Sequence, residues 1–252
     1  MKPFIIANWK CNPINLKEAK LLFNSVKIGL KDYKKAEVII CPPFIYLSSL
    51  NFQFAKKKTV LKLGAQDCFW EQKGAYTGEI SPMMLKNLGC KYVIIGHSER
   101  RKILNEANQS ITKKIKAVLS VNLKPILCIG ESKDEKENGK TQTVLKIQIE
   151  NSLKKITKKE IKNIIFAYEP VWAIGTGNSC SVDESHVVRL LIEKIISQKY
   201  SRLTAKKFTI LYGGSVTSSN VRDFIKEAGF HGVLVGGASL DSKEFIKLTK
   251  EF

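Results

Sequence analysis

The chain has 252 residues, of which 44% are hydrophobic, and a formal net charge of +19. This is enough apolar material for a core, and no run of about 18 uninterrupted apolar residues is present that could span a membrane. The first residues lack the apolar core and small-residue cleavage site of a signal peptide, and the six cysteines form no C-x-x-C pair. These features predict a cytoplasmic protein with reduced thiols and neither a disulfide framework nor a zinc site.

The positive charge lies mainly on lysine. Only 5 of the 42 basic residues are arginines, whose planar fork suits bases and phosphates best. The lysines form short clusters spread along the chain: Lys56 to Lys58, Lys113 and Lys114, Lys154 and Lys155, Lys158 and Lys159, Lys206 and Lys207. We interpret these clusters as solvated surface. Specific nucleic-acid binding is therefore not expected, whereas weak and salt-sensitive binding to polyanions is.

Apolar runs and helical stretches alternate along the chain. The apolar runs predict buried strands at Phe4–Asn8, Glu37–Cys41, Leu61–Gln66, Tyr92–Gly96, Pro125–Ile129, Ile164–Tyr168, Phe208–Leu211 and Gly232–Val235. The helices predicted to follow them are Leu16–Leu30, Ile45–Phe52, one starting at Ser81 and Pro82, Asn105–Val121, Gln142–Ile156, one from the Ser181-x-x-Glu184 capping box to Tyr200, one starting near Ser218 or Ser219, and Ser242–Lys250.

Eight strands that each precede a helix, within about 250 residues, predict a closed eight-stranded parallel (β/α)8 barrel. We expect residues 1–252 to form this barrel as one domain. The rival fold is a doubly wound open sheet. That fold would typically carry a G-x-G-x-x-G turn after the first strand, where this chain has Ala7-Asn8-Trp9-Lys10. The closed barrel is therefore preferred.

Polar side chains follow three of the predicted strands. Asn8 and Lys10 end the first strand, His97 follows the fourth, and Glu169 follows the sixth. Because parallel strands bring all their carboxyl ends to one rim of a barrel, a cation, an imidazole and a carboxylate are expected around a single pocket. His186 and His231 stand in no such motif. With three histidines and no paired ligand spacing, a catalytic metal is not expected.

Glycines mark the remaining parts of the predicted site. The strand-six carboxylate is followed by an apolar loop, residues 170–177, which has a glycine tip that includes Gly175; this predicts a lid over a base. Strands seven and eight each end in a glycine pair, the first preceding Ser215 and the second formed by Gly236 and Gly237. Backbone N–H groups without side chains around them can approach an anion closely, so these turns predict a phosphate site.

Five segments together resemble the triosephosphate isomerase family: Asn8-Trp9-Lys10, Gly96 to Arg101, Ala167 to Gly177, Tyr212 to Val216 and Gly236 to Leu240. The resemblance runs in order from residue 5 to about residue 250. It implies a TIM barrel that interconverts dihydroxyacetone phosphate and D-glyceraldehyde 3-phosphate through an enediolate, in glycolysis and gluconeogenesis, without a cofactor. Two alternatives stay open: another barrel enzyme acting on a sugar or indole phosphate, and a non-catalytic phosphate-binding or interaction protein.

The resemblance to this family also implies a role for individual residues of the site. Triosephosphate isomerase is itself a standard example of catalysis by an acid and a base that act as a pair. Glu169 is the base, made stronger by loss of water under the lid; His97, just before a helix, is a neutral electrophile; Lys10 is the cationic stabiliser. Asn8 donates a hydrogen bond to the developing oxyanion, and Glu99, beside Ser98, orients Lys10 from a second layer. The N–H groups expected to hold the phosphate belong to Gly175, Ser215, Gly236 and Gly237. At the far hinge of the lid this chain departs from the family, with Asn178 to Val182 replacing a basic residue and a later proline.

The segment 67–80 is long for a loop inside a compact domain, which usually indicates a function. The resemblance implies that it projects into the second subunit of a homodimer. Gln66, Thr77 and Glu79 would then face the partner, and Glu79 would pair with the partner's Arg100.

Overall fold

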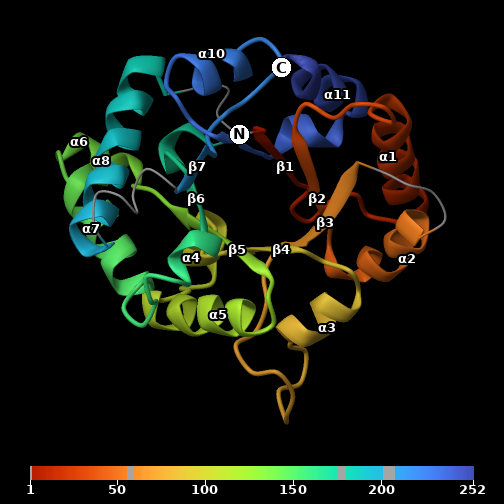
Figure 1. Cartoon of the computed structure of the whole chain (residues 1–252), viewed down its shortest axis with the longest axis horizontal. Helices are drawn as coiled ribbons and strands as arrows, with labels where there is room; N and C mark the ends of the chain where they lie inside the picture. Colours follow the sequence, from red (N-terminus) through yellow and green to blue (C-terminus); the bar gives the residue numbers. More distant parts are fainter. Residues whose placement is uncertain (1, 56–59, 175–179, 201–207) are drawn as a thin grey trace.

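The structure, a computed structural model, describes residues 2–55, 60–174, 180–200 and 208–252. Its parallel strands form a closed barrel in sequence order, with β8 returning to pair with β1 (Figure 1). The strands are β1 (Phe4–Asn8), β2 (Glu37–Cys41), β3 (Leu61–Ala65), β4 (Tyr92–Ile95), β5 (Lys124–Ile129), β6 (Ile165–Tyr168), β7 (Thr209–Tyr212) and β8 (Gly232–Val235). The predicted closed parallel barrel is confirmed.

Both faces of the strands are buried, which explains why they are continuous apolar runs. In β1 all five residues are buried. Ile5 and Ala7 belong to the outer layer of the core, which packs against the helices, whereas Ile6 belongs to the inner layer that fills the barrel together with Ile94 and Leu211. The two-residue period of a strand thus serves two cores at once.

The helices surround the barrel (Figure 1). Their bounds are α1 (Leu16–Gly29), α2 (Phe44–Ala55), α3 (Pro82–Asn87), α4 (Ser98–Ile103), α5 (Asn108–Ser120), α6 (Lys133–Glu137), α7 (Thr141–Ser152), α8 (Val182–Tyr200), α10 (Val221–Lys226) and α11 (Ser242–Lys250), with short 3-10 turns η1 (Ile161–Asn163), η2 (Val171–Ala173) and η3 (Gly237–Leu240). The predicted start of α3 is confirmed, because the side chain of Ser81 caps it and Pro82 occupies its first turn.

Some helix boundaries differ from the prediction. The helix predicted over about Asn105–Val121 is α5, which begins three residues later and ends one residue earlier than predicted. The short helix α4 begins directly after His97, and Asn105, between α4 and α5, adopts a left-handed backbone (φ 52°). α7 ends at Ser152, before the predicted Ile156, and α10 begins at Val221. Helix α6 was not predicted, although Ser132 and Glu135 form a reciprocal capping box at its start.

Two further features concern the surroundings of the barrel. The segment between β3 and α3 projects away from the barrel, and its residues 73 to 79 are exposed (Figure 1). None of the helices that the structure describes combines the length and apolar character needed to cross a lipid bilayer.

Candidate active site

A cavity of about 250 Å³ lies at the C-terminal ends of the barrel strands. Asn8, Lys10, His97 and Glu169 line it, together with the glycine turns after β7 and β8. The structure therefore brings together the cation, the imidazole and the carboxylate that the sequence predicted around one pocket. Gly175 was predicted to belong to the same site but lies outside the described residues, as does the rest of the lid tip, 176–179.

Glu169 is a buried carboxylate, with 2% of its surface exposed. Its Oε2 accepts a hydrogen bond from the backbone N–H of Ser98 at 2.9 Å, and its Oε1 lies 3.0 Å from Nε2 of His97. Glycines give it room: a Cβ on Gly130 would lie 1.7 Å from the Glu169 carbonyl oxygen, and one on Gly213 would lie 3.0 Å from its Cγ. The carboxylate is thus held at a fixed place, largely shielded from water.

His97 is the N-cap residue of α4, and its ring takes part in the cap. Nδ1 accepts a hydrogen bond from the backbone N–H of Glu99 at 3.3 Å. Because Nδ1 acts as an acceptor, this bonding assigns the ring proton to Nε2, which then donates to Glu169. The ring thus presents its Nε2–H group to the carboxylate of Glu169 at the wall of the cavity.

Lys10 lies just beyond β1 in a left-handed backbone conformation (φ 54°). For a non-glycine residue this conformation costs about 1 kcal/mol or more of free energy. Its backbone N–H donates to Oδ1 of Asn8 at 3.1 Å, and its carbonyl accepts from Nε2 of Gln66 at 2.8 Å. Its Nζ lies 2.6 Å from Oε1 of Glu99. These contacts fix both ends of the lysine, and Glu99 contacts it where the resemblance implied an orienting residue.

Two supporting residues were missed by the sequence reasoning. Gln66 was expected to face a partner subunit, yet its amide nitrogen bonds within its own chain, to the carbonyls of Lys10 and Cys41. Arg101 donates from Nε to the carbonyl of Gly96 at 2.7 Å, directly before His97, and burial lowers the pKa of its guanidinium. Both hold the backbone on which a site residue stands. The partners of Gln66 lie in other loops, so only the fold brings these contacts about, whereas Gly96 precedes Arg101 by five residues in the same segment.

The turns after β7 and β8 present backbone donors to the cavity. Within the described part of the chain, the N–H groups of Ser215, Gly236 and Gly237 have no acceptor. A Cβ on Gly236 would lie 3.4 Å from Cε of Lys10, so the lysine stem passes directly over this turn. Unpaired N–H groups beside an ammonium make a site for an anion.

Trp172, in η2 just after Glu169, rests on a buried carboxylate. Its Nε1 and the hydroxyl of Tyr168 each donate to Oε1 of Glu131 at 2.9 Å. Nζ of Lys136 lies 3.3 Å from the centroid of the Trp172 ring and 2.7 Å from Oε1 of Glu184 in α8. One cation thus links the loop after β6 to the helix that follows it. No sequence motif indicated this contact.

The start of α8 differs from the predicted capping box. Ser181 accepts from the backbone N–H of Glu184 at 3.2 Å, which confirms the first half. The carboxylate of Glu184 instead contacts Lys136 and Sγ of Cys180, at 2.7 and 3.3 Å. The backbone N–H of Cys180 donates to the hydroxyl of Tyr212 at 3.2 Å, which ties the end of the far hinge to β7.

Glu131 is expected to make stability depend on pH. Burial raises the pKa of its carboxyl, although hydrogen bonds from Trp172 and Tyr168 lower it in part. A folded-state pKa above the unfolded value means that the stabilising contribution is complete below the unfolded pKa and is lost as the pH rises through the folded pKa. Glu131→Gln removes this titration, so the free energy of unfolding of the variant, relative to the wild type, should increase as the pH rises above the ordinary range of a glutamate carboxyl, about pH 4 to 5.

Urea unfolding from that range upward in pH measures this effect. Glu137→Gln, at an exposed position of α6, is the matched control and should show no such trend. A Glu131→Gln variant that loses stability relative to the wild type as the pH rises would contradict the expectation.

Fold and site together define a barrel enzyme whose cavity combines a buried carboxylate, an imidazole, a fixed ammonium and unpaired backbone N–H groups. The family model described as triosephosphate isomerase matches residues 3–252. The chain is 44% identical over 251 residues to the triosephosphate isomerase of Dictyoglomus thermophilum, with 99% of each chain covered. It is 45% identical over 245 residues to that of Alkaliphilus oremlandii, with 97% of each covered. The chain therefore belongs to the triosephosphate isomerase family and is an isomerase.

Proposed function

We propose that this chain interconverts dihydroxyacetone phosphate and D-glyceraldehyde 3-phosphate. The observation that carries the proposal is the contact of the buried Glu169 carboxylate with Nε2 of His97 at 3.0 Å, inside a cavity that also holds Lys10. The reaction removes a proton from a carbon next to a carbonyl and returns it to the neighbouring carbon. A carboxylate shielded from water suits the first task, and a neutral N–H donor suits the oxygens.

In this mechanism the substrate oxygens replace Glu169 as the acceptors of the His97 Nε2–H group. The freed carboxylate takes the proton from carbon, and negative charge develops on the former carbonyl oxygen. The ammonium of Lys10 and the side-chain amide of Asn8 stabilise that charge. His97 then passes a proton between the two oxygens, and Glu169 returns its proton to the other carbon. All groups needed for proton transfer belong to the chain itself.

The phosphate of the substrate is proposed to bind the N–H groups of Ser215, Gly236 and Gly237, with Lys10 adjacent. Binding energy at the phosphate, remote from the reacting carbon, positions the substrate for proton transfer. The apolar loop after Glu169 would cover the intermediate, which loses phosphate readily in water. Gly175 is proposed to add one more N–H donor from that loop.

A coupled assay tests the proposal. The purified chain is supplied with glyceraldehyde 3-phosphate, and the dihydroxyacetone phosphate formed is reduced by a dehydrogenase whose NADH consumption is followed. We expect turnover without added metal or cofactor. Binding of the substrate without turnover would indicate a phosphate-binding protein instead.

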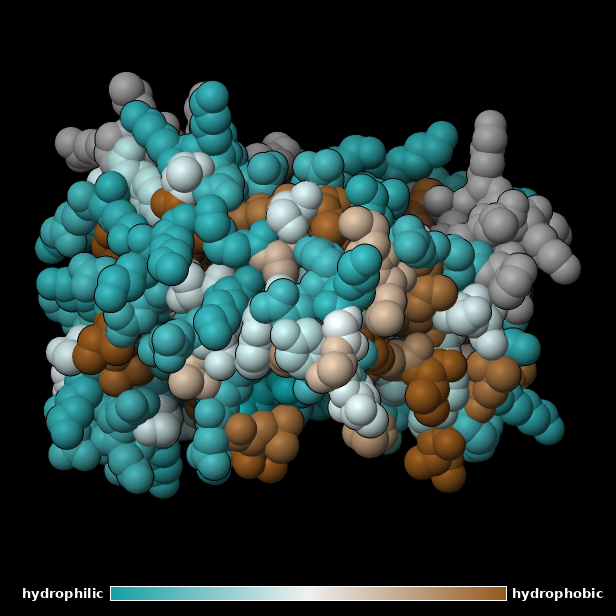
Figure 2. All heavy atoms as spheres, turned by 90° about the horizontal axis from the view of Figure 1, so that it is seen from below, coloured by the Kyte–Doolittle hydropathy of each residue, from teal (hydrophilic) through white to brown (hydrophobic). Residues whose placement is uncertain are grey.

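We further propose a cytoplasmic homodimer. The free thiols of the chain suit a reducing compartment. The projecting segment 73–79 is fully exposed, and large apolar side chains that include Ile14, Tyr76 and Met84 are exposed as well. Figure 2 views the molecule from the side on which this segment projects and shows hydrophobic groups among the hydrophilic surface. A second copy of the chain would cover such side chains.

Dilution tests the dimer. Thr77 and Glu79 are proposed to face the partner subunit, with Glu79 paired to the partner's Arg100, and these contacts would support the loops that carry Lys10 and His97. The specific activity is therefore expected to fall when the protein is diluted until light scattering or mass photometry detects monomers. A monomer with full turnover would refute this role of the interface.

A further inference from the structure

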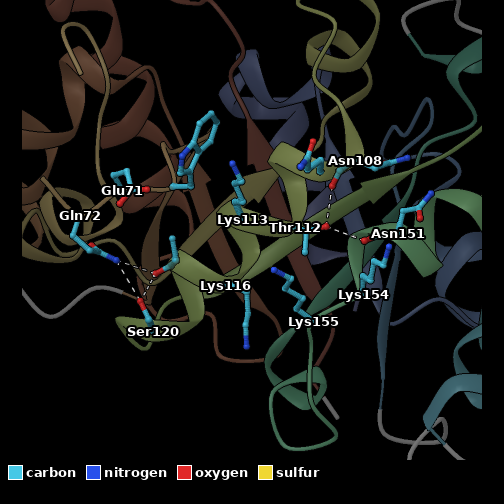
Figure 3. A pocket seen from close by; sticks show the side chains of 13 residues that line it. Glu71, Gln72, Asn108, Thr112, Lys113, Lys116, Ser120, Asn151, Lys154 and Lys155 are labelled. Carbon is cyan, nitrogen blue, oxygen red and sulfur yellow. Dashed lines mark hydrogen bonds between the residues drawn. The ribbon is translucent and has the colours of Figure 1, made fainter. Parts of the chain in front are cut away.

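A cavity of about 890 Å³ lies on the outside of the barrel and shares no lining residue with the cavity of Glu169. It is bounded by α5, by the end of α7 and by the first residues of the segment after β3. Figure 3 shows Gln72 at one end of this groove and Lys154 at the other, with Lys113 and Lys116 of α5 between them. We call it the α5 groove. The proposed isomerase reaction does not use it.

The α5 groove carries uncompensated positive charge. Four of its lining residues are lysines, Lys113, Lys116, Lys154 and Lys155, whereas Glu71 is its only acidic lining residue. Lys116 pairs with Glu160 at 2.9 Å, but no described carboxylate lies within ion-pair distance of the other three lysines. Cations gathered in a hollow repel one another and concentrate a field that attracts anions. An anion of more than one charge therefore fits this surface.

The other end of the α5 groove is built for a flat ring. Trp70 is half-buried there, supported by Phe69 with ring centroids 4.1 Å apart, and Nζ of Lys113 lies 5.1 Å from its centroid. Gln72 donates from Nε2 to the carbonyl of Ala117 and to Oγ of Ser120, which ties the segment that carries Trp70 to α5. A half-buried indole held in this way offers its ring to another planar aromatic ring.

We propose that the α5 groove binds a nucleotide, with its phosphates on Lys154 and Lys155 and its base against Trp70. Basic side chains next to an aromatic platform are the combination by which proteins hold bases linked to phosphates. The nucleotide can be free or part of a single strand. An acidic peptide would use the lysines but not the indole.

Calorimetric titration of the intact protein with ATP tests the proposal, with inorganic tripolyphosphate, adenosine and a single-stranded oligoadenylate as further probes. The variant Lys154→Gln/Lys155→Gln is compared with Lys158→Gln/Lys159→Gln. The second variant loses the same charge at exposed positions just outside the groove. We expect the first to weaken ATP binding about tenfold and the second less than about twofold. Trp70→Leu should weaken ATP binding about fivefold or more but leave tripolyphosphate binding unchanged.

The probes separate the sources of the nucleotide. Tighter binding of oligoadenylate than of ATP, lost in the Lys154→Gln/Lys155→Gln variant, assigns the groove to a single strand; the reverse order assigns it to a free nucleotide. Both outcomes support the proposal. Equal loss in the two double variants, equal affinity for tripolyphosphate and ATP, or no binding of either nucleotide would overturn it. Isomerase turnover of the double variants, which is expected to be unchanged, shows that they are folded.

Discussion

Replacing Glu169 by glutamine is expected to lower kcat about 10²- to 10⁴-fold, because the amide cannot take a proton from carbon. The substitution keeps the size of the side chain. Its carbonyl oxygen can still accept the backbone N–H of Ser98, which now lies 2.9 Å from Oε2, and Nδ1 of His97 still accepts the backbone N–H of Glu99. The affinity for substrate should therefore change much less than the rate. The coupled assay at saturating and at low substrate separates the two quantities.

Glu150→Gln is the matched control for this experiment. Glu150 is exposed on α7 and does not line the active-site cavity, so its loss should leave kcat within about twofold. The free energies of unfolding of both variants show whether the fold is intact. A Glu169→Gln variant that retains wild-type kcat would exclude this carboxylate as the base and with it the proposed mechanism.

The barrel could be predicted because each buried strand is a run of apolar residues with a clear end. The bounds of β1, β2, β8 and α11 agree with the prediction residue by residue. The prediction failed where local signals were weak. The sequence predicts that a helix begins at Asn105, but this residue adopts a left-handed backbone, which its residue type permits but does not require, and α5 begins only at Asn108. Helix α6 is only five residues long. Short helices offer too few residues for a periodic pattern.

The polar residues at the strand ends could be placed on one rim of the barrel, because parallel strands have all their carboxyl ends on the same side. This rule correctly predicted that Lys10, His97 and Glu169 line one cavity. The supporting contacts could not be predicted in the same way. Gln66 bonds to a carbonyl 56 residues away, and Glu131 accepts from an indole 41 residues away. Such pairs depend on how loops of different strands meet in space, which no local pattern encodes.

Lys114 shows the limit of arguing from composition. It was grouped with Lys113 as solvated surface, and this is wrong: only 4% of Lys114 is exposed. The helical period of α5 places Lys114 on the buried face, because Ile111, Ile115 and Val118 mark that face and Lys114 lies among them. Lys113 is one position away and is exposed.

Lys114 is important for stability because it lies in a buried cluster of charged side chains. Its Nζ contacts both carboxylate oxygens of Asp67, at 2.9 and 2.7 Å, and also Oε1 of Glu106. Arg100 reaches Asp67 from the other side at 2.9 Å. Burial raises the pKa of the Asp67 carboxyl, and the nearby Lys114 and Arg100 offset part of that rise. The Asp67 carboxyl therefore depends on Lys114 and Arg100 to remain charged inside the protein.

Lys114→Met is expected to lower the free energy of unfolding by about 3 to 5 kcal/mol, because it leaves buried carboxylates without their main partner. Lys113→Met on the same helix is the control and should change it by less than about 0.5 kcal/mol. Adding Asp67→Asn to Lys114→Met should restore part of the loss. The loss of stability in Lys114→Met should also be smaller at acidic pH. Removing the cation raises the folded-state pKa of Asp67 further. A raised folded-state pKa stabilises the fold at low pH, and this stabilisation is lost as the pH rises through the folded-state pKa. Urea unfolding at one fixed protein concentration measures all these values, and equal effects of Lys114→Met and Lys113→Met would show that the cluster contributes nothing to stability.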